Sequence, residues 1–521
     1  MAILVLIGWV SAMAALIAQS YAQNSGASLA TDLARYGSAA TWRGVYYRGE
    51  KIGFTVSQTV PRDDGFSIEE TGRLQMTLLG ATSAATITST AQVDRNFALR
   101  SFEFSLDPMT GPTTIRGTLN GQRLSLTISS ASGTRSEERV LEEPPALSQN
   151  LPRRLASAGL VTGTRHQWTL FDPATLRNSP VTITVGEREV VRGGASPMPA
   201  FRVEMEFAGL RTTSWVTDTG EVIREESPMG LITVRETPER AQALAVSDRM
   251  RVDLLQASSV VPKTAKPIDD PGGVVSMRLR LEGVDLASAG VDALDGGTQR
   301  VTGDLIELRN AVDLRSERHD ADLTKYLRPE PFIESDAPEI LAEAETAVQG
   351  VTGTRARVER LTRYVNGLLE KKPTVSLPSA REVLRTRVGD CNEHTVLFVA
   401  MARALGIPAR IAVGMVYVHG AFYYHAWPEV FLEEGANRGV WMPVDPTLNQ
   451  FPADTTHLRL TRGGLDKQAA ILPLIGRLSM TVVDVEMAPS AAPVLVGRDS
   501  VDLGSLAVPI PQRQRRCCIC P

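Results

Sequence analysis

The sequence predicts an α+β protein in which a mainly antiparallel β region precedes a core of helices and strands on the C-terminal side. Two observations support this fold class. From about Trp42 to Glu236, apolar and polar residues alternate with a period of two, which is typical of strands with one wet face. From about Asp336 onward, apolar residues recur every three or four positions, which indicates amphipathic helices.

Length and charge limit the number of domains and the class of partner. The chain has 521 residues, of which 43% are hydrophobic and 22% are charged, close to the averages for globular proteins. A chain of this length is expected to form roughly two to four domains, and we expect about three. The formal net charge of -4 gives no basic surface for nucleic acid. We therefore expect no nucleic-acid partner.

Residues 1–22 have the pattern of a signal peptide or a membrane anchor. The run from Ile3 to Ala18 is almost entirely apolar, but it is shorter than the roughly 20 residues that span a bilayer comfortably. The small residues around Ser20 and Ala22 form a cleavage-site pattern. No basic residue precedes the apolar run, so a cleaved signal, an uncleaved anchor that associates with a membrane, and a misplaced start remain alternatives. We expect an exported protein, either periplasmic or anchored and facing outside the cytoplasm.

The β region is expected to form an antiparallel sheet that is open, curled or sandwiched. Phe201, Val203 and Met205 alternate with charged residues, as expected for a strand with one buried face. Asn120 and Gly121 stand between two alternating segments and predict a type I′ hairpin turn, in which both turn residues have positive φ. The apolar face is interpreted as core, with an apolar ligand site inside a curled sheet as the alternative.

Proline-rich sequence and the change of period mark the boundaries between segments. Residues 260–273 contain three prolines and read as a linker or an irregular edge. Asp336 is expected to cap the first helix of the C-terminal core, and Ser379 with Glu382 forms a capping-box pattern before a shorter helix. The expected organisation is a signal or anchor (1–22), an antiparallel β domain (40–255), a small β-rich connecting segment (274–330), a catalytic domain (331–486) and a flexible tail (487–521).

The four cysteines are distributed unevenly along the chain. Cys391 alone lies in the body of the protein, whereas Cys517, Cys518 and Cys520 stand among the last five residues. No disulfide framework is therefore possible within the core. The tail cysteines are interpreted as part of a disordered segment that is prone to oxidation or metal binding.

Cys391 is expected to begin a helix, because Gly389 and Asp390 form a turn before it and an apolar run follows as far as Gly406. Unpaired amide groups and the positive end of the helix dipole favour a thiolate at this position and lower the pKa of the cysteine. The same amides can stabilise an oxyanion. The sequence thus places a nucleophile where its activation is favoured.

His425 and Asp445 follow on expected strands, in the order cysteine, histidine, aspartate. In cysteine catalysis the imidazole takes the thiol proton and later protonates the leaving amine, while the carboxylate orients the imidazole and stabilises its charged form. We therefore expect Cys391, His425 and Asp445 to be the catalytic residues. Attack of the thiolate on an amide would give a thioester.

Three sequence blocks occur in the order of a known family. The run G-D-C-N-E-H contains Cys391, H-A-W-P-E-V begins at His425, and W-M-P-V-D-P-T contains Asp445. With an intervening helix that ends in G-I-P-A-R and a trailing L-T-R-G-G, these blocks resemble the bacterial transglutaminase-like superfamily over about residues 330–485. The resemblance implies a papain-like α+β core and acyl transfer from amides by a catalytic triad at those three positions.

Several residues near the triad have more than one interpretation. A zinc site made of Cys391, His394, His419 and His425 is the metal-binding alternative, because Cys-x-x-His is a ligand-like spacing. Trp427 and Trp441 either shield the triad from water or fill the core. Glu393 either contacts the site or serves as a first-turn acid of the helix. The second oxyanion donor is not assigned from the sequence.

The favoured function is a transglutaminase-like cysteine peptidase, amidase or acyltransferase that acts on peptide or protein amides through a thioester on Cys391. The alternative is a non-catalytic transglutaminase-like module for binding or envelope assembly. A lipid-binding β domain is a third reading, which a large apolar cavity in the β region would favour. We expect no cofactor and no metal, and the oligomeric state is left open.

Overall fold

The computed structural model describes residues 36–489, apart from short stretches within that range. These stretches are residues 38, 79–80, 194–195, 208–209, 228–229, 244–257, 284–293, 315–316, 319–322, 436–437, 465–470, 472–473 and 475–476. The N-terminal segment 1–22 and the tail cysteines lie outside the described residues. The predictions made for them therefore stay predictions.

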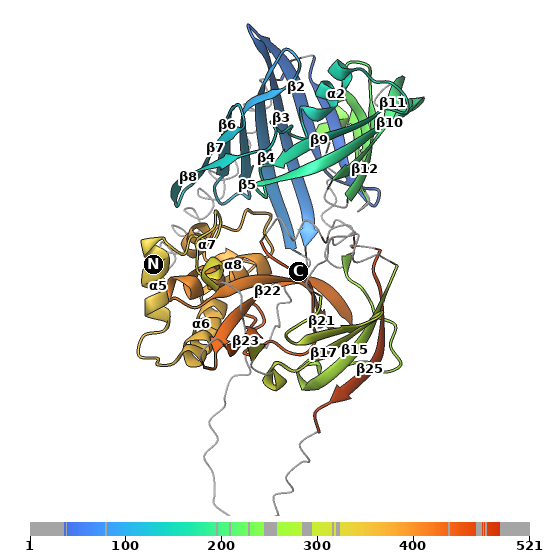
Figure 1. Ribbon diagram of the computed structural model, residues 1–521. Coiled ribbons are helices and arrows are strands. Elements are labelled where there is room, and N and C mark those ends of the chain that lie inside the picture. Colours follow the sequence, from blue (N-terminus) through green and yellow to red (C-terminus); the bar gives the residue numbers. More distant parts are fainter. Residues whose placement is uncertain are drawn as a thin grey trace, which may run out of the picture.

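The first half of the described chain forms one 14-stranded antiparallel sheet, with two short helices at its margins (Figure 1). The elements are β1 (Thr41–Tyr47), β2 (Glu50–Arg62), β3 (Gly65–Leu78), β4 (Ala81–Asp94), β5 (Leu99–Asp107), β6 (Thr113–Asn120), β7 (Arg123–Ser130), β8 (Gly133–Val140), α2 (Leu151–Ala158), β9 (Arg165–Asp172), β10 (Arg177–Gly193), β11 (Ser196–Phe207), β12 (Leu210–Val216), β13 (Val222–Glu226), β14 (Leu231–Glu236) and α3 (Pro238–Gln242). The first strand pairs with the last, β1 with β14, so the sheet grows outward in two arms from its middle.

The sheet is curled, so that residues from both of its arms share one core. Phe102 on β5 contacts Phe171 on β9 with ring centroids 5.5 Å apart, although these strands lie far apart in the strand order. A cavity of about 410 Å³ lies within the curl. Its walls are mixed, since they include the apolar Met205 and Phe207 as well as Arg43 and the half-buried Glu225.

The hairpin predicted at Asn120 and Gly121 exists, but its turn lies one residue later. Asn120 still pairs with Arg123 in the ladder, so Gly121 and Gln122 are the two turn residues. Gly121 has a φ of 61°, and neither Asn120 nor Gln122 has positive φ. A turn with positive φ only at its first central residue is of the II′ class, so the type I′ prediction was wrong.

The second half of the described chain contains two larger sheets, a two-stranded parallel sheet of β19 and β20, and the main helices (Figure 1). The elements are η1 (Pro271–Gly273), β15 (Val274–Glu282), β16 (Gln299–Thr302), β17 (Leu305–Arg309), η2 (Ala311–Asp313), β18 (Glu317–Arg318), η3 (Leu323–Tyr326), α5 (Pro338–Ala347), α6 (Thr354–Leu368), β19 (Glu370–Lys371), α7 (Ala380–Thr386), β20 (Val388–Gly389), α8 (Cys391–Ala404), β21 (Ala409–Val418), β22 (Ala421–Glu433), β23 (Arg438–Pro443), β24 (His457–Arg462) and β25 (Ser479–Met487). The described chain is thus mostly antiparallel β with few helices, and the longest helices lie on its C-terminal side.

The central unit of this half is α8 packed on a five-stranded sheet, in the order β18-β23-β22-β21-β24. Nearly every side chain of α8, β21 and β22 is buried, as expected for a helix and strands that are apolar around most of their surface. The helices α5, α6 and α7 also contact α8. The papain-like arrangement inferred from the resemblance stays a prediction.

The start of α5 corrects one predicted cap. Asp336 was expected to cap this helix, but Ala337 holds the N-cap position and no side chain caps it. Asp336 instead forms an ion pair with Arg135 of the β domain, with N and O atoms 3.3 Å apart. At Ser379 half of the predicted capping box is confirmed, since its side chain accepts a hydrogen bond from the Glu382 amide at the start of α7. The other half does not form, because the Ser379 amide bonds the Leu377 carbonyl and the Glu382 carboxylate pairs with Arg385.

The connecting segment shares a sheet with the end of the described chain. Strand β25 pairs with β15, and β15 pairs with β17, in a four-stranded sheet of order β16-β17-β15-β25. The proline-rich stretch before β15 lies against the C-terminal half, because Val260 exchanges two backbone hydrogen bonds with Phe422. The β15–β25 pairing joins Arg278 to Asp484, 484 − 278 = 206 residues apart, and the Val260–Phe422 bonds join residues 422 − 260 = 162 apart.

We predict that Gly414→Ala destabilises the C-terminal half. A Cβ at Gly414 would lie 2.0 Å from the Leu458 carbonyl oxygen, where β21 meets β24 at an irregular register. Overpacking of this kind costs about 1–3 kcal/mol. Gly367→Ala is the control, because a Cβ there meets nothing within 4 Å. Replacing glycine by alanine at an exposed helical position such as this one in α6 stabilises the protein by about 0.5–1 kcal/mol. Equilibrium urea unfolding should give opposite signs for the two variants; equal stabilities would contradict the prediction.

Candidate active site

The nucleophile predicted from the sequence lies at the first position of α8, where a complete capping box holds the helix N-terminus. The Asp390 side chain accepts a hydrogen bond from the Asn392 amide at 2.9 Å, and the Glu393 carboxylate accepts one from the Asp390 amide at 2.8 Å. Glu393 therefore caps the helix. The capping box fixes the direction in which the chain enters α8 and hence the position of Cys391.

A contact between α8 and β22 brings Cys391 to His425. Thr395, one helical turn beyond Cys391, donates a hydrogen bond of 3.0 Å to the carbonyl of Ala426, the residue after His425. The Cys391 side chain lies close enough to His425 to help raise the pKa of the imidazole. The Nδ1 atom of His425 has no hydrogen-bond partner among the described residues, whereas Nε2 bonds Asp445, so Nδ1 is the ring nitrogen left for the thiol.

The other ring nitrogen of His425 bonds the predicted carboxylate. Its Nε2 donates to Asp445 Oδ2 at 2.7 Å, and both side chains are fully buried. The other carboxylate oxygen accepts hydrogen bonds from the amides of Thr447 and Leu448 at 2.8 and 2.9 Å. The structure therefore brings together Cys391, His425 and Asp445 in the order that the sequence predicted.

A second histidine, which the sequence analysis missed, binds the same carboxylate. His457 at the start of β24 places its Nε2 3.1 Å from Asp445 Oδ2, and its Nδ1 lies 3.1 Å from Asp454 Oδ1. The only signal in the sequence was the spacing D-T-T-H at 454–457, which has no chemical meaning without the fold. One oxygen atom of Asp445 thus accepts hydrogen bonds from two imidazoles.

Carboxylates set the charge state of both imidazoles. Burial alone disfavours a charged imidazole, but the charge and hydrogen bond of Asp445, together with the Cys391 side chain, raise the pKa of His425 to about 10. Burial also opposes the charge on His457, and its hydrogen bonds to Asp445 and Asp454 raise its pKa to about 9. Burial by itself would raise the pKa of Asp445, but the two histidines hold it well below its usual value.

Asp390 and Tyr424, beside the predicted nucleophile, both favour their neutral forms. Burial and the nearby charges of Glu393 and Cys391 raise the pKa of Asp390 well above its usual value, which favours its neutral form. Burial, with the charges of Cys391 and Asp390, also raises the pKa of Tyr424. The nucleophile is therefore next to a carboxyl group and a phenol that both tend to keep their protons.

The segment 372–379 connects the site with the β domain. Thr374 and Ser376 donate hydrogen bonds to Glu393 Oε1, beside the start of α8. Val375 and Leu377, which alternate with them, pack into the apolar core of the curled sheet. One short segment thus contacts the capping box on one side and the β domain on the other.

The two tryptophans left open by the sequence have different positions. The Trp427 ring stacks on His425 at 6.0 Å between centroids and contacts His457 at 5.0 Å, so it packs against both imidazoles. Trp441 instead contacts Tyr326 and Phe431, away from the triad. Trp427 is thus the tryptophan that shields the site.

The alternative zinc set is not assembled. His419 is exposed in the turn between β21 and β22, and His394 bonds the Asp390 carbonyl with its Nδ1 at 2.7 Å. Among the described residues, the group whose ligand atoms lie within 4.8 Å of one another is His425, Asp445 and His457. The hydrogen bonds between them already engage Asp445 Oδ2 and both Nε2 atoms.

The sequence and the structure were compared with known proteins. Residues 342–446 match the family model described as the transglutaminase-like superfamily, which confirms the resemblance for that segment. No curated protein matches the chain. The matching segment includes Cys391 and His425 and ends one residue after Asp445.

Solved structures that match the chain do so weakly. A β-barrel-like protein with a domain of unknown function from Brucella abortus is 13% identical, with a TM-score of 0.30 over 38% of this chain and 96% of the other. A candidate cysteine protease from Cytophaga hutchinsonii is 17% identical, with a TM-score of 0.28 over 42% of this chain and 89% of the other. The transglutaminase-like match rests on the sequence of residues 342–446, because structural likeness at this level carries no argument.

We predict that His457→Ala destabilises the protein in a pH-dependent way. The pKa of His457 is raised from 6.5 to about 9, so its contribution to stability is fully present below about pH 6.5 and is lost as the pH rises through about 9. Removing one partner of a buried ion pair costs about 3–5 kcal/mol. Urea unfolding should therefore show the full loss near pH 6 and a much smaller loss near pH 9.5.

His419→Asn is the matched control for this experiment. His419 is an exposed histidine with a φ of 47°, a conformation that asparagine tolerates. Its replacement should leave stability nearly unchanged at either pH. A loss in His457→Ala that is equal at pH 6 and pH 9.5 would show that the ring acts by packing alone.

Proposed function

We propose that this protein is a cysteine enzyme that attacks peptide or protein amides and forms a thioester on Cys391. The supporting observation is that the Asp445 carboxylate bonds His425, whose imidazole lies near the Cys391 side chain at a capped helix N-terminus. The match of residues 342–446 to the transglutaminase-like superfamily is consistent with this class of chemistry. Peptidase, amidase and transglutaminase activities share this first step.

The reaction follows from the positions of the three groups. The thiol proton passes to His425 Nδ1, and the thiolate attacks the amide carbonyl carbon to give a tetrahedral oxyanion. The C–N bond then breaks as the imidazolium protonates the leaving amine, which leaves an acyl thioester on Cys391. Water or an amine attacks the thioester, gives its proton to His425 and releases the thiolate. These steps are also those expected if the C-terminal core has the papain-like arrangement that the sequence resemblance implies.

The electrostatics of the site support a thiolate and imidazolium pair at neutral pH. Asp445 stabilises positive charge on His425, whose pKa is raised to about 10. Asp390 tends to be neutral because its pKa is raised, so it adds little negative charge beside the thiolate. Oriented amides at the start of α8 favour negative charge on sulfur and on the oxyanion.

A non-catalytic transglutaminase-like module for binding or envelope assembly is the second candidate. One observation favours it: Cys391 is only 1% exposed, and His425 and Asp445 are fully buried. An amide can reach the sulfur only if the groups that cover it move. Reactivity of the thiol in the folded protein is therefore the measurement that separates the two candidates.

The location of the protein is proposed from its N-terminal sequence alone. The apolar run in residues 1–22 is the pattern of a signal peptide or an anchor, and we propose export to the periplasm or to the outer face of a membrane. Within the described part of the chain, none of the helices combines the length and apolar character needed to cross a bilayer.

We predict that iodoacetamide labels Cys391 at a rate that stays high well below pH 8. An ordinary thiol with a pKa near 8.5 loses about tenfold in rate for each pH unit below that value. If His425 holds a thiolate, the rate near pH 6 should remain within a few-fold of the rate near pH 8, and His425→Ala should restore the steep dependence. Mass spectrometry of the Cys391 peptide separates this signal from that of Cys517, Cys518 and Cys520.

Two results would count against the proposed enzyme. A labelling profile that follows an ordinary thiol would mean that no thiolate and imidazolium pair forms. Labelling that occurs only in urea would mean that the site does not open, and the non-catalytic candidate would then be preferred. Loss of the label from this peptide in Cys391→Ser is the control for its assignment to Cys391.

A further inference from the structure

A cavity of about 1020 Å³ lies between the two C-terminal sheets, away from the triad. One wall is formed by β21, β22, β23 and the end of β24, and the other by β15, β16, β17 and the residues around them. None of Cys391, His425 and Asp445 lines it. Phe431, which lines the pocket, follows His425 by six positions along β22, a distance of ~20 Å. This volume is at the upper end of the range for small-molecule sites, roughly 300–1,000 Å³.

The first wall carries an excess of positive charge. Arg410 and Arg462 both bind the same oxygen atom of Glu429, with Nε to Oε2 distances of 2.7 and 3.0 Å. The other oxygen of Glu429 accepts a hydrogen bond from the buried Arg459 at 3.0 Å. One carboxylate therefore faces three guanidinium groups. Burial would raise the pKa of Glu429, but these three charges hold it well below its usual value.

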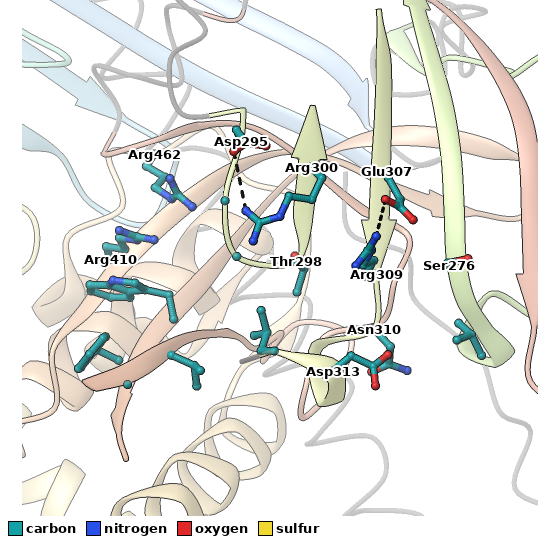
Figure 2. Close-up of a pocket in the computed structure, with 18 of the residues that line it drawn as sticks. Ser276, Asp295, Thr298, Arg300, Glu307, Arg309, Asn310, Asp313, Arg410 and Arg462 are labelled. Carbon is teal, nitrogen blue, oxygen red and sulfur yellow. Dashed lines mark hydrogen bonds and ion pairs between the residues drawn. The ribbon is translucent and has the colours of Figure 1, made fainter. Parts of the chain in front are cut away.

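Glu429 holds the guanidinium groups of both Arg410 and Arg462, and an aromatic ring also supports that of Arg410. Arg410 lies over the Trp441 ring at 3.8 Å from the centroid. Each guanidinium has five N–H donors, and Glu429 engages only some of those on Arg410 and Arg462. Figure 2 shows Arg410 and Arg462 on the same side of the pocket, with Arg300 extending toward them.

The acidic residues of the opposite wall have partners on their own side of the pocket. Glu307 bonds Arg309 at 2.8 Å, and Asp295 lies 3.8 Å from Arg300 (Figure 2). Glu486 accepts a hydrogen bond from Ser276 at 3.0 Å. Asp313 interacts with the charge of Arg309. The opposite wall thus has four lining carboxylates against two lining guanidinium groups, and the positive excess is local to the arginines around Glu429.

We propose that this pocket binds an oxyanion, a phosphate or a carboxylate group, through Arg410 and Arg462. Planar guanidinium groups match such oxygen pairs with two parallel charge-assisted hydrogen bonds, and an anion would balance charge that Glu429 alone leaves in excess. The site is independent of the triad, so it does not depend on the proposed enzyme activity.

The test is thermal unfolding of the full chain with increasing inorganic phosphate or succinate, against sodium chloride at matched ionic strength. Binding to the folded state raises the unfolding midpoint with the logarithm of the anion concentration once that concentration exceeds Kd. Arg462→Gln should weaken the apparent affinity about tenfold or more, because a charge-assisted hydrogen bond is lost. This variant should still fold, since Arg410 and Arg459 remain on Glu429. Arg462→Lys should fall between the wild type and Arg462→Gln.

Arg278→Gln is the matched control, because Arg278 on β15 is exposed, pairs with Asp484 and does not line the pocket. A rise above the sodium chloride baseline in the wild type and in Arg278→Gln that begins at higher anion concentration in Arg462→Gln supports the site, and the more effective of phosphate and succinate identifies the ligand chemistry. Equal rises in all variants would show a general salt effect and overturn the proposal. No rise above the sodium chloride baseline with either anion in the wild type would overturn it as well.

Discussion

The buried carboxylate of Asp445 is the constraint on which the C-terminal half of the molecule depends. A fully buried negative charge is stable only if hydrogen bonds and opposite charges surround it. Two imidazoles and two backbone amides meet this need, and they come from β22, from β24 and from the turn that follows Asp445. The three segments must therefore converge on one point, and that convergence also orients His425 toward Cys391.

Helix α8 meets this point from the other side of the site. Its capping box and the bond from Thr395 to the Ala426 carbonyl fix both its end and its register on β22. Glu393 in turn depends on Thr374 and Ser376, whose neighbours Val375 and Leu377 pack into the curled sheet. Further contacts join the two halves, including the hydrogen bond of 2.7 Å from Ser132 to Glu382. The β domain thus supports the segment that holds the nucleophile in place.

Local sequence rules succeeded where one short segment contains the whole cause. The start of α8 at Cys391, the cap at Ser379 and the buried face of β11 followed from capping residues and from periodicity. Errors arose where a neighbour in space decided the outcome. Asp336 leaves its expected cap position to pair with Arg135 of the β domain. The turn at Gly121 shifts by one residue because the ladder keeps Asn120 paired.

By itself, the sequence determined the identity and order of Cys391, His425 and Asp445, the helical start beneath the nucleophile and the alternation of the β region. These features are local, because capping groups and apolar periodicity act within a few residues. Tertiary structure alone decided that His457 shares the carboxylate, that β25 completes the sheet of β15, and that three arginines gather on Glu429. Each of these features requires strands that are distant in sequence to pair in one register. That register is favoured because it gives partners to buried charges and buried backbone groups, and these groups are buried only in the folded chain.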